Sequence, residues 1–600
     1  ERVQIFSKLD YELTDNLTTF TEVSFSRNEI RDIMGANRLI QTVTDTGYFV
    51  DKDHPFNFFI SDGGEGITYA GPDAFANNPS LEAVDLIYRG RPLGSTYDGE
   101  NAEEIITTFQ NIRISTGFDY EINNNWVFHA NYTWSNSGMN RITPREYDGE
   151  KFQEQLLLGT FNPFGTAIIS PELISPKDGV SLAGNSQGDI DNFTFRRVDN
   201  SKVIQSVAEA VISGETPLNL PAGALAIAIG GQYRYLDLSD IPDGRWQTGN
   251  NGVLETVPPV FGTQGVYALF GEMAIPLFDR LEIQTALRYE DYGDQGGDTL
   301  DPKVSAKFDI TDNLFVRGSW GTSFQTPSLR QLSGSVSIAG VVDPVDPTAG
   351  NFSVSIVTLG ASGLTPQSSE NVNLGLVFRS DDGFDVSVDY WTYDYKGLIL
   401  PGADPQAIID AVFAGDLPAD RVIRDAVGQP QAIFATYENR GSAKATGFDI
   451  VARYSIDILS SSKVTFDLSS TIITKYLSSE FGDILGSRNF ANGFGSTPNF
   501  KLNGGVTLNL ENHTINVTTR YIGAYKDDQF DNPIDAQTTI DMRYSLFLEE
   551  FLGDGGATFG IGITNVFDKR PPLIHSRPLF DNEVHDPRGR IIYTTLKKLF

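Results

Sequence analysis

The chain has 600 residues, of which 58 are glycine, 40 phenylalanine and 23 tyrosine, and it contains no cysteine. The formal net charge of −33 argues against a nucleic-acid partner, because phosphate backbones are bound through an excess of Lys and Arg. The lack of cysteine excludes disulfides, thiol chemistry and cysteine-ligated metals, and five scattered histidines without HExxH spacing disfavour a zinc enzyme. No apolar run reaches the roughly 18 residues of a transmembrane helix, whereas transmembrane strands of about ten alternating residues leave a weaker signal.

Period-two alternation of apolar and polar residues, the pattern of a strand with one apolar face, recurs along the chain. It is clearest over residues 281–291, where the odd positions are mostly apolar and the even positions mostly polar. The strands predicted in this way lie at 3–13, 17–27, 104–120, 126–134, 193–212, 224–235, 266–278, 281–291, 302–310, 314–320, 371–378, 384–393, 433–454, 464–476, 501–510, 514–521, 538–547, 557–566 and 590–600. A further local β-segment is predicted over 84–89.

The connections between these strands alternate between short and long. Short polar turns are predicted near residues 15, 124, 221, 279, 312, 382, 459, 512 and 553. Longer connections are predicted at 29–102, 139–190, 241–261, 294–299, 326–366, 398–431, 478–496, 527–534 and 567–588. Short turns at one end and long loops at the other are typical of an outer-membrane β-barrel.

One long connection has a different pattern. Over residues 404–427 the apolar residues recur at helical spacing, with interruptions at Gly415 and Pro418. We therefore predict two short helices in the loop 398–431, which serve either to pack the loop or as part of a lid over a ligand.

The fold class that follows is all-β: a transmembrane antiparallel β-barrel with about 19 strands. A β-propeller would show a repeat of about 40 residues, which this sequence lacks. Closure into a barrel also solves the edge problem of so long an antiparallel meander. In 266–329 we expect the turns 278–280 and 311–313 to share one end, with the apolar stripe facing lipid and the polar stripe facing the lumen.

Six motifs, in a consistent order, carry a resemblance to a known family. They are Leu220–Gly223 followed by Gly231–Arg234, Leu314–Leu329, Leu364–Pro366 followed by Ser369–Asn371, Tyr437–Asn439 followed by Gly447–Asp449, Asn565–Asp568, and Asp586–Phe600. On these motifs the chain resembles the barrel of TonB-dependent outer-membrane receptors. The terminal aromatic residue Phe600 fits the barrel-assembly signal that the resemblance implies, although Lys598 stands where an apolar residue is usual.

The resemblance implies a barrel of about 22 strands that is filled by a plug domain and driven by a TonB-type energy-transducing complex. Residues 1–600 are then read as a single barrel domain, truncated at its N-terminal side, with about three strands and the plug upstream. The predicted location is the outer membrane of a Gram-negative bacterium. The predicted partners are outer-membrane lipid and lipopolysaccharide, the TonB-type complex acting through the plug, and a nutrient ligand; a monomeric barrel is expected.

Aromatic residues in the long connections are the candidate ligand-binding residues, because aromatic faces suit sugars, peptides and aromatic chelates. They are Phe56, Phe58, Tyr97, Phe164, Trp246 and Phe261. The alternative is that these residues pack the loops together or against the plug.

No catalytic constellation is evident, so we do not expect an enzyme, and we expect no cofactor. Calcium is the one metal considered, because Asp291, Asp294, Asp298 and Asp301 supply the hard oxygen ligands that it prefers. Haem receptors of the family that this chain resembles usually place a histidine in an external loop near the motif at 324–329. No histidine lies between Phe324 and Glu370, so the resemblance disfavours haem.

Two functions remain open at this point. The first is energy-coupled uptake of a scarce or bulky nutrient: a siderophore, an oligosaccharide or a peptide. The second is a passive channel or a structural outer-membrane barrel. A soluble β-rich adhesin is a third possibility, and it would require the apolar stripes to be buried between sheets.

Overall fold

The structure is a computed structural model of the 600-residue chain. It describes all residues except 35–47, 65, 89–91, 93–102, 165–184, 186, 249, 252–256, 294–295, 343–351, 403–404, 425–429, 460, 490–493, 529, 551–554, 576–578 and 599–600.

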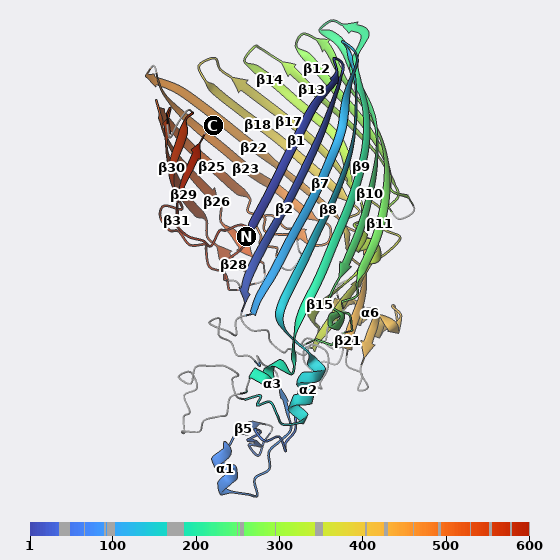
Figure 1. The fold of residues 1–600 in the computed structure, drawn as a ribbon, viewed down its shortest axis with the longest axis vertical. Coiled ribbons are helices and arrows are strands. Elements are labelled where there is room, and N and C mark those ends of the chain that lie inside the picture. The colour runs from blue at the N-terminus through green and yellow to red at the C-terminus, as the bar shows by residue number, and fades with distance from the viewer. Residues whose placement is uncertain are drawn as a thin grey trace.

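A single large antiparallel sheet, curved into a barrel wall, makes up most of the molecule (Figure 1). Over the described residues it contains 20 strands, of which β24 has only two residues, so 19 strands build the wall. This confirms the predicted number. The strands are β1 (Arg2–Thr14), β2 (Leu17–Met34), β7 (Glu103–Asn123), β8 (Trp126–Tyr147), β9 (Thr194–Leu220), β10 (Gly223–Ile241), β11 (Val260–Phe278), β12 (Leu281–Asp291), β13 (Asp298–Asp309), β14 (Leu314–Gln325), β17 (Gln367–Arg379), β18 (Phe384–Lys396), β22 (Ser442–Leu459), β23 (Ser462–Ser478), β24 (Gly482–Asp483), β25 (Phe500–Leu510), β26 (His513–Ile522), β29 (Gln537–Leu548), β30 (Ala557–Thr564) and β31 (Ile591–Lys598).

The connections confirm the predicted alternation of short and long. Short turns join the strand pairs at one end of the wall, and the long connections gather at the other end (Figure 1). Strands β8 and β9 continue well beyond their predicted limits and have 22 and 27 residues. A strand of 27 residues reaches roughly 90 Å, far more than the 9–11 residues needed to cross a bilayer. The extra residues of β8, 135–147, lie at the long-loop end, whereas those of β9, 213–220, lie at the short-turn end, so each strand is longer than a bilayer crossing requires.

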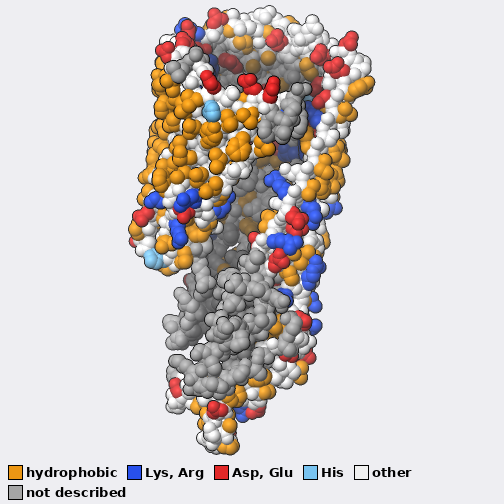
Figure 2. Space-filling view, turned by 60° about the vertical axis from the view of Figure 1, so that its left-hand side comes forward, with side chains coloured by type: hydrophobic (Ala, Val, Ile, Leu, Met, Phe, Trp, Pro, Cys, Tyr) orange, Lys and Arg blue, Asp and Glu red, His pale blue; other side chains and the backbone are white. Residues whose placement is uncertain are grey.

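Apolar side chains cover the outer face of the wall, and polar side chains line its inner face. Figure 2 shows hydrophobic side chains spread over the outside and a hollow interior that opens at the short-turn end. In β12 the outward residues include Leu287, which is 48% exposed, whereas Gln284 and Ala286 line the interior. The expected assignment of the two stripes is therefore confirmed.

Aromatic residues mark two levels on the outer face. At the level nearer the short turns, the ring of Phe384 lies 6.3 Å from that of Phe378 and 6.0 Å from that of Tyr454. Six residues further along β18, roughly 20 Å away, Tyr390 lies 5.4 Å from Phe448 on the neighbouring strand. Transmembrane barrels carry an apolar band about 25 Å tall between two aromatic girdles, and the spacing here is close to that value.

A charged residue in this band should destabilise the barrel. We expect Leu287→Arg to lower the free energy of unfolding by about 2 kcal/mol, because the guanidinium would meet lipid between the midplane and a girdle. Ala286→Arg is the matched control, since the next residue of β12 faces the hollow interior and its charge stays in water. Urea unfolding in lipid vesicles measures both changes. Equal losses in the two variants would contradict this assignment of the faces.

The long connections carry their own secondary structure. It comprises β3 (Tyr48–Val50), β4 (Phe59–Ser61), β5 (Ile67–Tyr69), α1 (Pro72–Asn77), β6 (Leu86–Tyr88), α2 (Gly149–Leu157), α3 (Gln187–Asp191), α4 (Gly244–Thr248), α5 (Leu329–Ser333), β15 (Ser335–Val342), β16 (Phe352–Leu359), β19 (Ile399–Pro401), α6 (Pro405–Ala414), η2 (Ala419–Arg421), β20 (Val422–Arg424), β21 (Pro430–Asn439), β27 (Tyr525–Asp527) and β28 (Asn532–Ile534). None of the helices within the described part of the chain is both long enough and apolar enough to cross a membrane.

One predicted strand is wrong. Residues 433–454 were expected to form a single strand, but the chain turns at Gly441, whose φ of 80° suits glycine. The part before the turn, β21, pairs with β16, β19 and β20 in a small sheet within the loops. The part after it, β22, joins the barrel wall between β18 and β23. Both halves are rich in β-forming residues, so only the turn distinguishes them.

The wall has two unpaired edges among the described strands. β1 pairs only with β2, and β31 pairs only with β30. All residues of β1 are exposed, as expected for a strand with one free edge. Since β1 and β31 are the first and last of 19 successive antiparallel strands, they run in the same direction.

Candidate functional site

The inner face of the wall is a polar surface that surrounds a hollow. At the short-turn end a hollow of about 610 Å³ is lined by residues that include Glu272, Gln284 and Lys303. On the same face, Arg317 of β14 donates two hydrogen bonds to Asp389 of β18, at 3.0 and 2.8 Å. This surface would be wetted readily by water and by a hydrophilic solute.

A second cluster of hydrogen-bonded polar side chains lies on β10, on β12 and just after β12. The carboxylate of Glu290 is only 3% exposed and accepts hydrogen bonds from Arg234, Arg288 and Tyr292. Gln232 links the group to its neighbours, because its Oε1 accepts from Arg234 at 2.9 Å. These bonds tie the side chains of adjacent strands together on the inner face.

An aromatic ladder, formed by Trp391, Tyr393 and Tyr395, runs along the inner face of β18. These residues share the phase of Asp389, whose partner Arg317 places that phase inside. The ring of Tyr393 lies 5.8 Å from that of Trp391 and 6.2 Å from that of Tyr395. Tyr393 and Tyr395 are 39% and 36% exposed, so the ladder offers ring surface to the interior.

The ladder ends at a cavity of about 230 Å³ on the long-loop side. Its lining consists of Ser323, Phe324, Gln325, Gln367, Ser368, Ser369, Tyr395, Leu398, Ala443, Tyr476 and Phe494. Gln367 donates to the Oε1 of Gln325 at 3.2 Å and accepts from the backbone N–H of Ile399 at the same distance. The hydroxyl of Ser369, a residue that is 6% exposed, has no hydrogen-bond partner among the described residues. The cavity therefore combines aromatic surface with neutral hydroxyl and amide groups.

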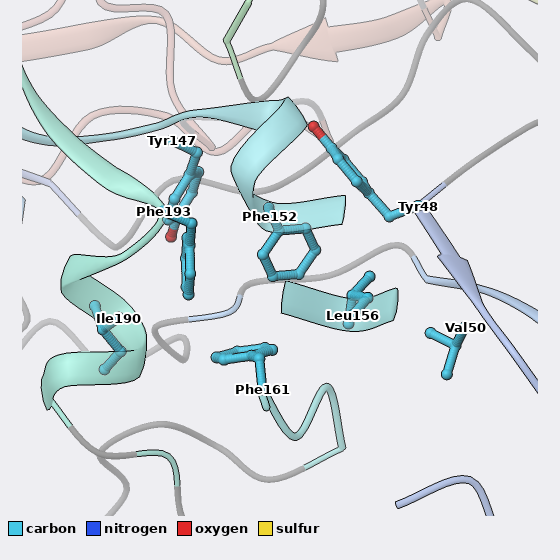
Figure 3. Packing of buried hydrophobic residues seen from close by; sticks show 8 residues of the cluster. All are labelled: Tyr48, Val50, Tyr147, Phe152, Leu156, Phe161, Ile190 and Phe193. Atoms are coloured by element: carbon cyan, nitrogen blue, oxygen red, sulfur yellow. The ribbon is translucent and has the colours of Figure 1, made fainter. Parts of the chain in front are cut away.

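Two of the longest connections are fastened to each other by a buried aromatic core (Figure 3). This loop core consists of Tyr48, Val50, Tyr147, Phe152, Leu156, Phe161, Ile190 and Phe193. The ring of Phe152 on α2 lies 5.0 Å from Tyr48, 5.3 Å from Phe161 and 5.0 Å from Phe193. Burial on this scale gives the connections a fixed structure of their own.

A polar contact extends the loop core to a third connection. Asp148 caps the N-terminus of α2 by accepting from the backbone N–H of Lys151 at 3.0 Å. Its other oxygen accepts from Nε of Arg245 in α4 at 3.2 Å. The side chain of Asp148 is 4% exposed, so this ion pair is protected from solvent on the carboxylate side.

The predicted aromatic ligand residues that the structure describes are scattered and do not meet the ladder. Phe58 packs edge to face on Phe75, and Phe164 packs against the loop core and Phe59. The guanidinium of Arg197 lies over the ring of Trp246, with its Cζ 3.7 Å from the ring centre. The described contacts of these side chains are with other side chains of this protein, and their part in ligand binding stays a prediction.

Of two further predicted residues, one lies beside a buried histidine in a loop and the other lies on the outer face of the wall. Phe56 lies beside His54, whose Nδ1 accepts from the backbone N–H of Phe56 at 3.3 Å. Burial lowers the pKa of His54, which favours the neutral ring that this contact requires. Phe261 is 58% exposed and shares the outward phase of Leu269 on β11, so it points away from the lumen. Tyr97 and Phe600 lie outside the described residues.

The acidic loop proposed for calcium shows turn-forming contacts. Asp291 accepts from the backbone N–H of Gly293 at 2.8 Å, and Asp301 accepts from the hydroxyl of Thr322 at 2.9 Å. Asp294 lies outside the described residues. Within the described ranges no three acidic or histidine side chains gather into a metal-binding group. The calcium site stays a prediction.

The ladder residues were missed by the sequence analysis, although a signal for them exists. The segment 384–393 was predicted as a strand with an apolar and a polar phase. In 391–395 large aromatic residues enter the polar phase, which is the phase that faces the interior. Aromatic residues on the polar stripe of a barrel strand indicate that this part of the inner face contacts something other than water.

A buried histidine in the long connections predicts a pH response. His585 is 4% exposed, stacks on Tyr525 at 6.0 Å, and its Nδ1 lies 2.8 Å from Oε1 of Gln537. Tyr525 in turn donates to Asp581 at 2.6 Å. Burial lowers the pKa of His585 despite the nearby charge of Asp581, while Lys501 acts with burial.

Because the folded pKa lies below the unfolded value of about 6.5, this group weakens the loops as pH falls below that value. We expect hydrogen-exchange protection of 523–536 to fall by up to about tenfold per pH unit below about pH 6.5, since one proton is taken up on opening. His585→Gln should remove this dependence. His513, at the short-turn end, gives the control variant His513→Gln, in which the pH response should persist.

Comparison with known proteins agrees with this architecture. The family model described as TonB dependent receptor-like, beta-barrel matches residues 41–566. The ferric enterobactin receptor PfeA of Pseudomonas aeruginosa, in a mutant form, aligns with a TM-score of 0.61 and 16% identity over 99% of this chain and 69% of its own. The siderophore receptor PirA of Acinetobacter baumannii aligns with a TM-score of 0.58 and 14% identity, over 100% of this chain and 71% of its own.

The ferric-catecholate import receptor Fiu of E. coli K12 gives a TM-score of 0.54 and 12% identity, over 100% of this chain and 74% of its own. At these identities the solved structures show a common fold. A comparison with curated protein sequences gives no match. The match to the family model covers most of the chain. The chain therefore belongs to the TonB-dependent receptor-like β-barrel family.

Proposed function

We propose that this chain is the barrel of an outer-membrane receptor that takes up a scarce or bulky nutrient by TonB-dependent, energy-coupled transport. The observation that carries the proposal is the polar hollow interior, with an aromatic ladder and cavity at its long-loop end, in a member of this family. The ligand would enter from the structured loops, bind at that end, and pass along the polar lumen. No arrangement of catalytic residues takes part in this function.

Energy coupling would act through a plug domain seated in the lumen and contacted by a TonB-type complex of the inner membrane. The outer face would contact lipid and lipopolysaccharide in the outer membrane of a Gram-negative bacterium, and the barrel would act as a monomer. The similar solved structures are named as receptors for ferric enterobactin and other siderophores, which supports a small-molecule nutrient as the class of ligand.

Growth of the source bacterium with and without its energy transducer tests this function. Ferric enterobactin is supplied as the sole iron source, and maltoheptaose or a hexapeptide as the sole carbon source. We expect deletion of the receptor gene to abolish growth on at least one such nutrient, and deletion of the transducer to lower uptake at least about tenfold. Uptake that needs the receptor but not the transducer would establish a passive channel instead.

A further inference from the structure

The class of ligand can be narrowed from the chemistry of the ladder and its cavity. The ladder presents successive rings on every second residue of β18, and Tyr395 belongs to both the ladder and the cavity. Beyond Tyr395, the ring of Tyr476 on β23 lies 6.1 Å from that of Phe494. The aromatic surface therefore continues from the wall into the loop end of the barrel as a connected track.

The cavity carries no formal charge. Among the described residues, its lining contains no Asp, Glu, Lys or Arg; the polar groups are the hydroxyls of Ser323, Ser368, Ser369 and tyrosines and the amides of Gln325 and Gln367. On the ladder strand, Asp389 pairs with Arg317 of β14 through two hydrogen bonds, so these two charges neutralise each other. A polyanionic iron chelate requires compensating cations, which bind such groups through charge-assisted hydrogen bonds. This lining does not provide them.

Neutral hydroxyl and amide groups beside flat aromatic rings suit a different ligand. A pyranose ring has an apolar C–H face, which stacks on an aromatic ring, and an edge of hydroxyls that both donate and accept hydrogen bonds. The unpartnered hydroxyl of Ser369, buried at the cavity wall, supplies a donor and acceptor for such a hydroxyl. The cavity of about 230 Å³ is smaller than the roughly 300–1,000 Å³ of pockets for drug-sized ligands, so it has room for a single ring.

We infer that the cavity and the aromatic ladder bind a neutral oligosaccharide, with one sugar ring in the cavity and the following rings stacked along Tyr395, Tyr393 and Trp391. This inference rests on the proposed uptake function and specifies its substrate class. The stacked contacts tolerate different sugars, while the cavity selects the terminal unit through its hydroxyl and amide groups.

The test uses the full-length receptor in detergent on an array of neutral oligosaccharides, with ferric enterobactin and a hexapeptide titrated in parallel. We expect at least one neutral oligosaccharide to bind and the other two probes not to bind. Tyr395→Ala should weaken binding of that sugar at least about tenfold, because it removes the ring shared by ladder and cavity. Tyr395→Phe keeps the ring and should stay within about threefold.

Tyr390→Ala is the matched control on β18, because Tyr390 faces outward in the aromatic girdle and should leave sugar binding unchanged. Two results would overturn the inference: absence of binding to every neutral oligosaccharide on the array, or sugar binding that Tyr395→Ala does not weaken. Binding of ferric enterobactin that is lost in Tyr395→Ala would assign the same site to a chelate. Transducer-dependent growth on iron or peptide would still support the proposed uptake function in that case.

Discussion

Replacement of Phe152 by alanine is expected to release the external loops from their fixed structure while the barrel stays folded. Phe152 is fully buried, and its ring lies within 5.6 Å, centre to centre, of Tyr48, Tyr88, Phe161 and Phe193. Truncation of a buried phenylalanine typically costs about 3–5 kcal/mol through lost transfer free energy and the cavity left behind. The loop core has few other buried residues, so this loss is a large part of its stability.

Limited proteolysis with chymotrypsin measures this effect. The Phe152→Ala variant should be cut within 48–88 and 147–193 much faster than the parent chain, while its barrel keeps the gel mobility of the folded form without heating. Leu157→Ala on the same helix is the matched control, because Leu157 is 63% exposed and its truncation removes little burial. Unchanged cleavage in Phe152→Ala would show that contacts other than the loop core hold the connections.

The barrel wall was predictable because the alternation of apolar and polar residues within each strand reflects the different environments of its two faces. In 281–291 the alternation is set by lipid on one side and water on the other, and both act on every residue of the strand. The same cause explains the failures. Beyond Trp134 of β8 the alternation of apolar and polar residues ends, so the predicted strand stopped 13 residues before Tyr147.

The loop core and the ladder were harder to predict for a different reason. Val50 and Phe193 belong to one cluster although they are more than 140 residues apart in the sequence. No local sequence pattern predicts this contact. Trp391 and Tyr395 were visible as aromatic residues in a strand, but their significance depends on which face of that strand is inside. That assignment follows from the Arg317–Asp389 pair, which only the folded wall brings together.

Closure of the wall is constrained by strand direction. Because β1 and β31 run in the same direction, a direct pairing between them would be parallel, whereas every neighbouring pair in this wall is antiparallel. Antiparallel closure therefore needs an odd number of further strands between the two edges. Three strands would satisfy this condition and give an even-numbered barrel, the usual form in bacterial outer membranes.

Removal of the carboxylate of Glu290 is the second large effect we expect. Glu290 is 3% exposed, and its carboxylate forms ion pairs with both Arg234 of β10 and Arg288 of β12, so its single negative charge offsets part of their two positive charges. Breaking a buried ion pair by removing one partner typically costs about 3–5 kcal/mol, because the remaining charge is left uncompensated. Here the side chains of the arginines are 27% and 31% exposed, so water relieves part of the penalty and we expect about 3 kcal/mol.

Urea unfolding in lipid vesicles, followed by the fluorescence of tryptophan, tests the effect of Glu290→Ala. Glu282→Ala is the matched control, since Glu282 lies on the same face of β12 toward the short-turn end and lines the open hollow. The double variant Glu290→Ala/Arg234→Ala should recover part of the loss, because it removes one of the two uncompensated cations. The alternative result is additivity: the double variant loses as much unfolding free energy as Glu290→Ala and Arg234→Ala lose together. The two residues would then act independently. The network would then be a set of separate surface contacts, and not the coupled link between strands that its geometry indicates.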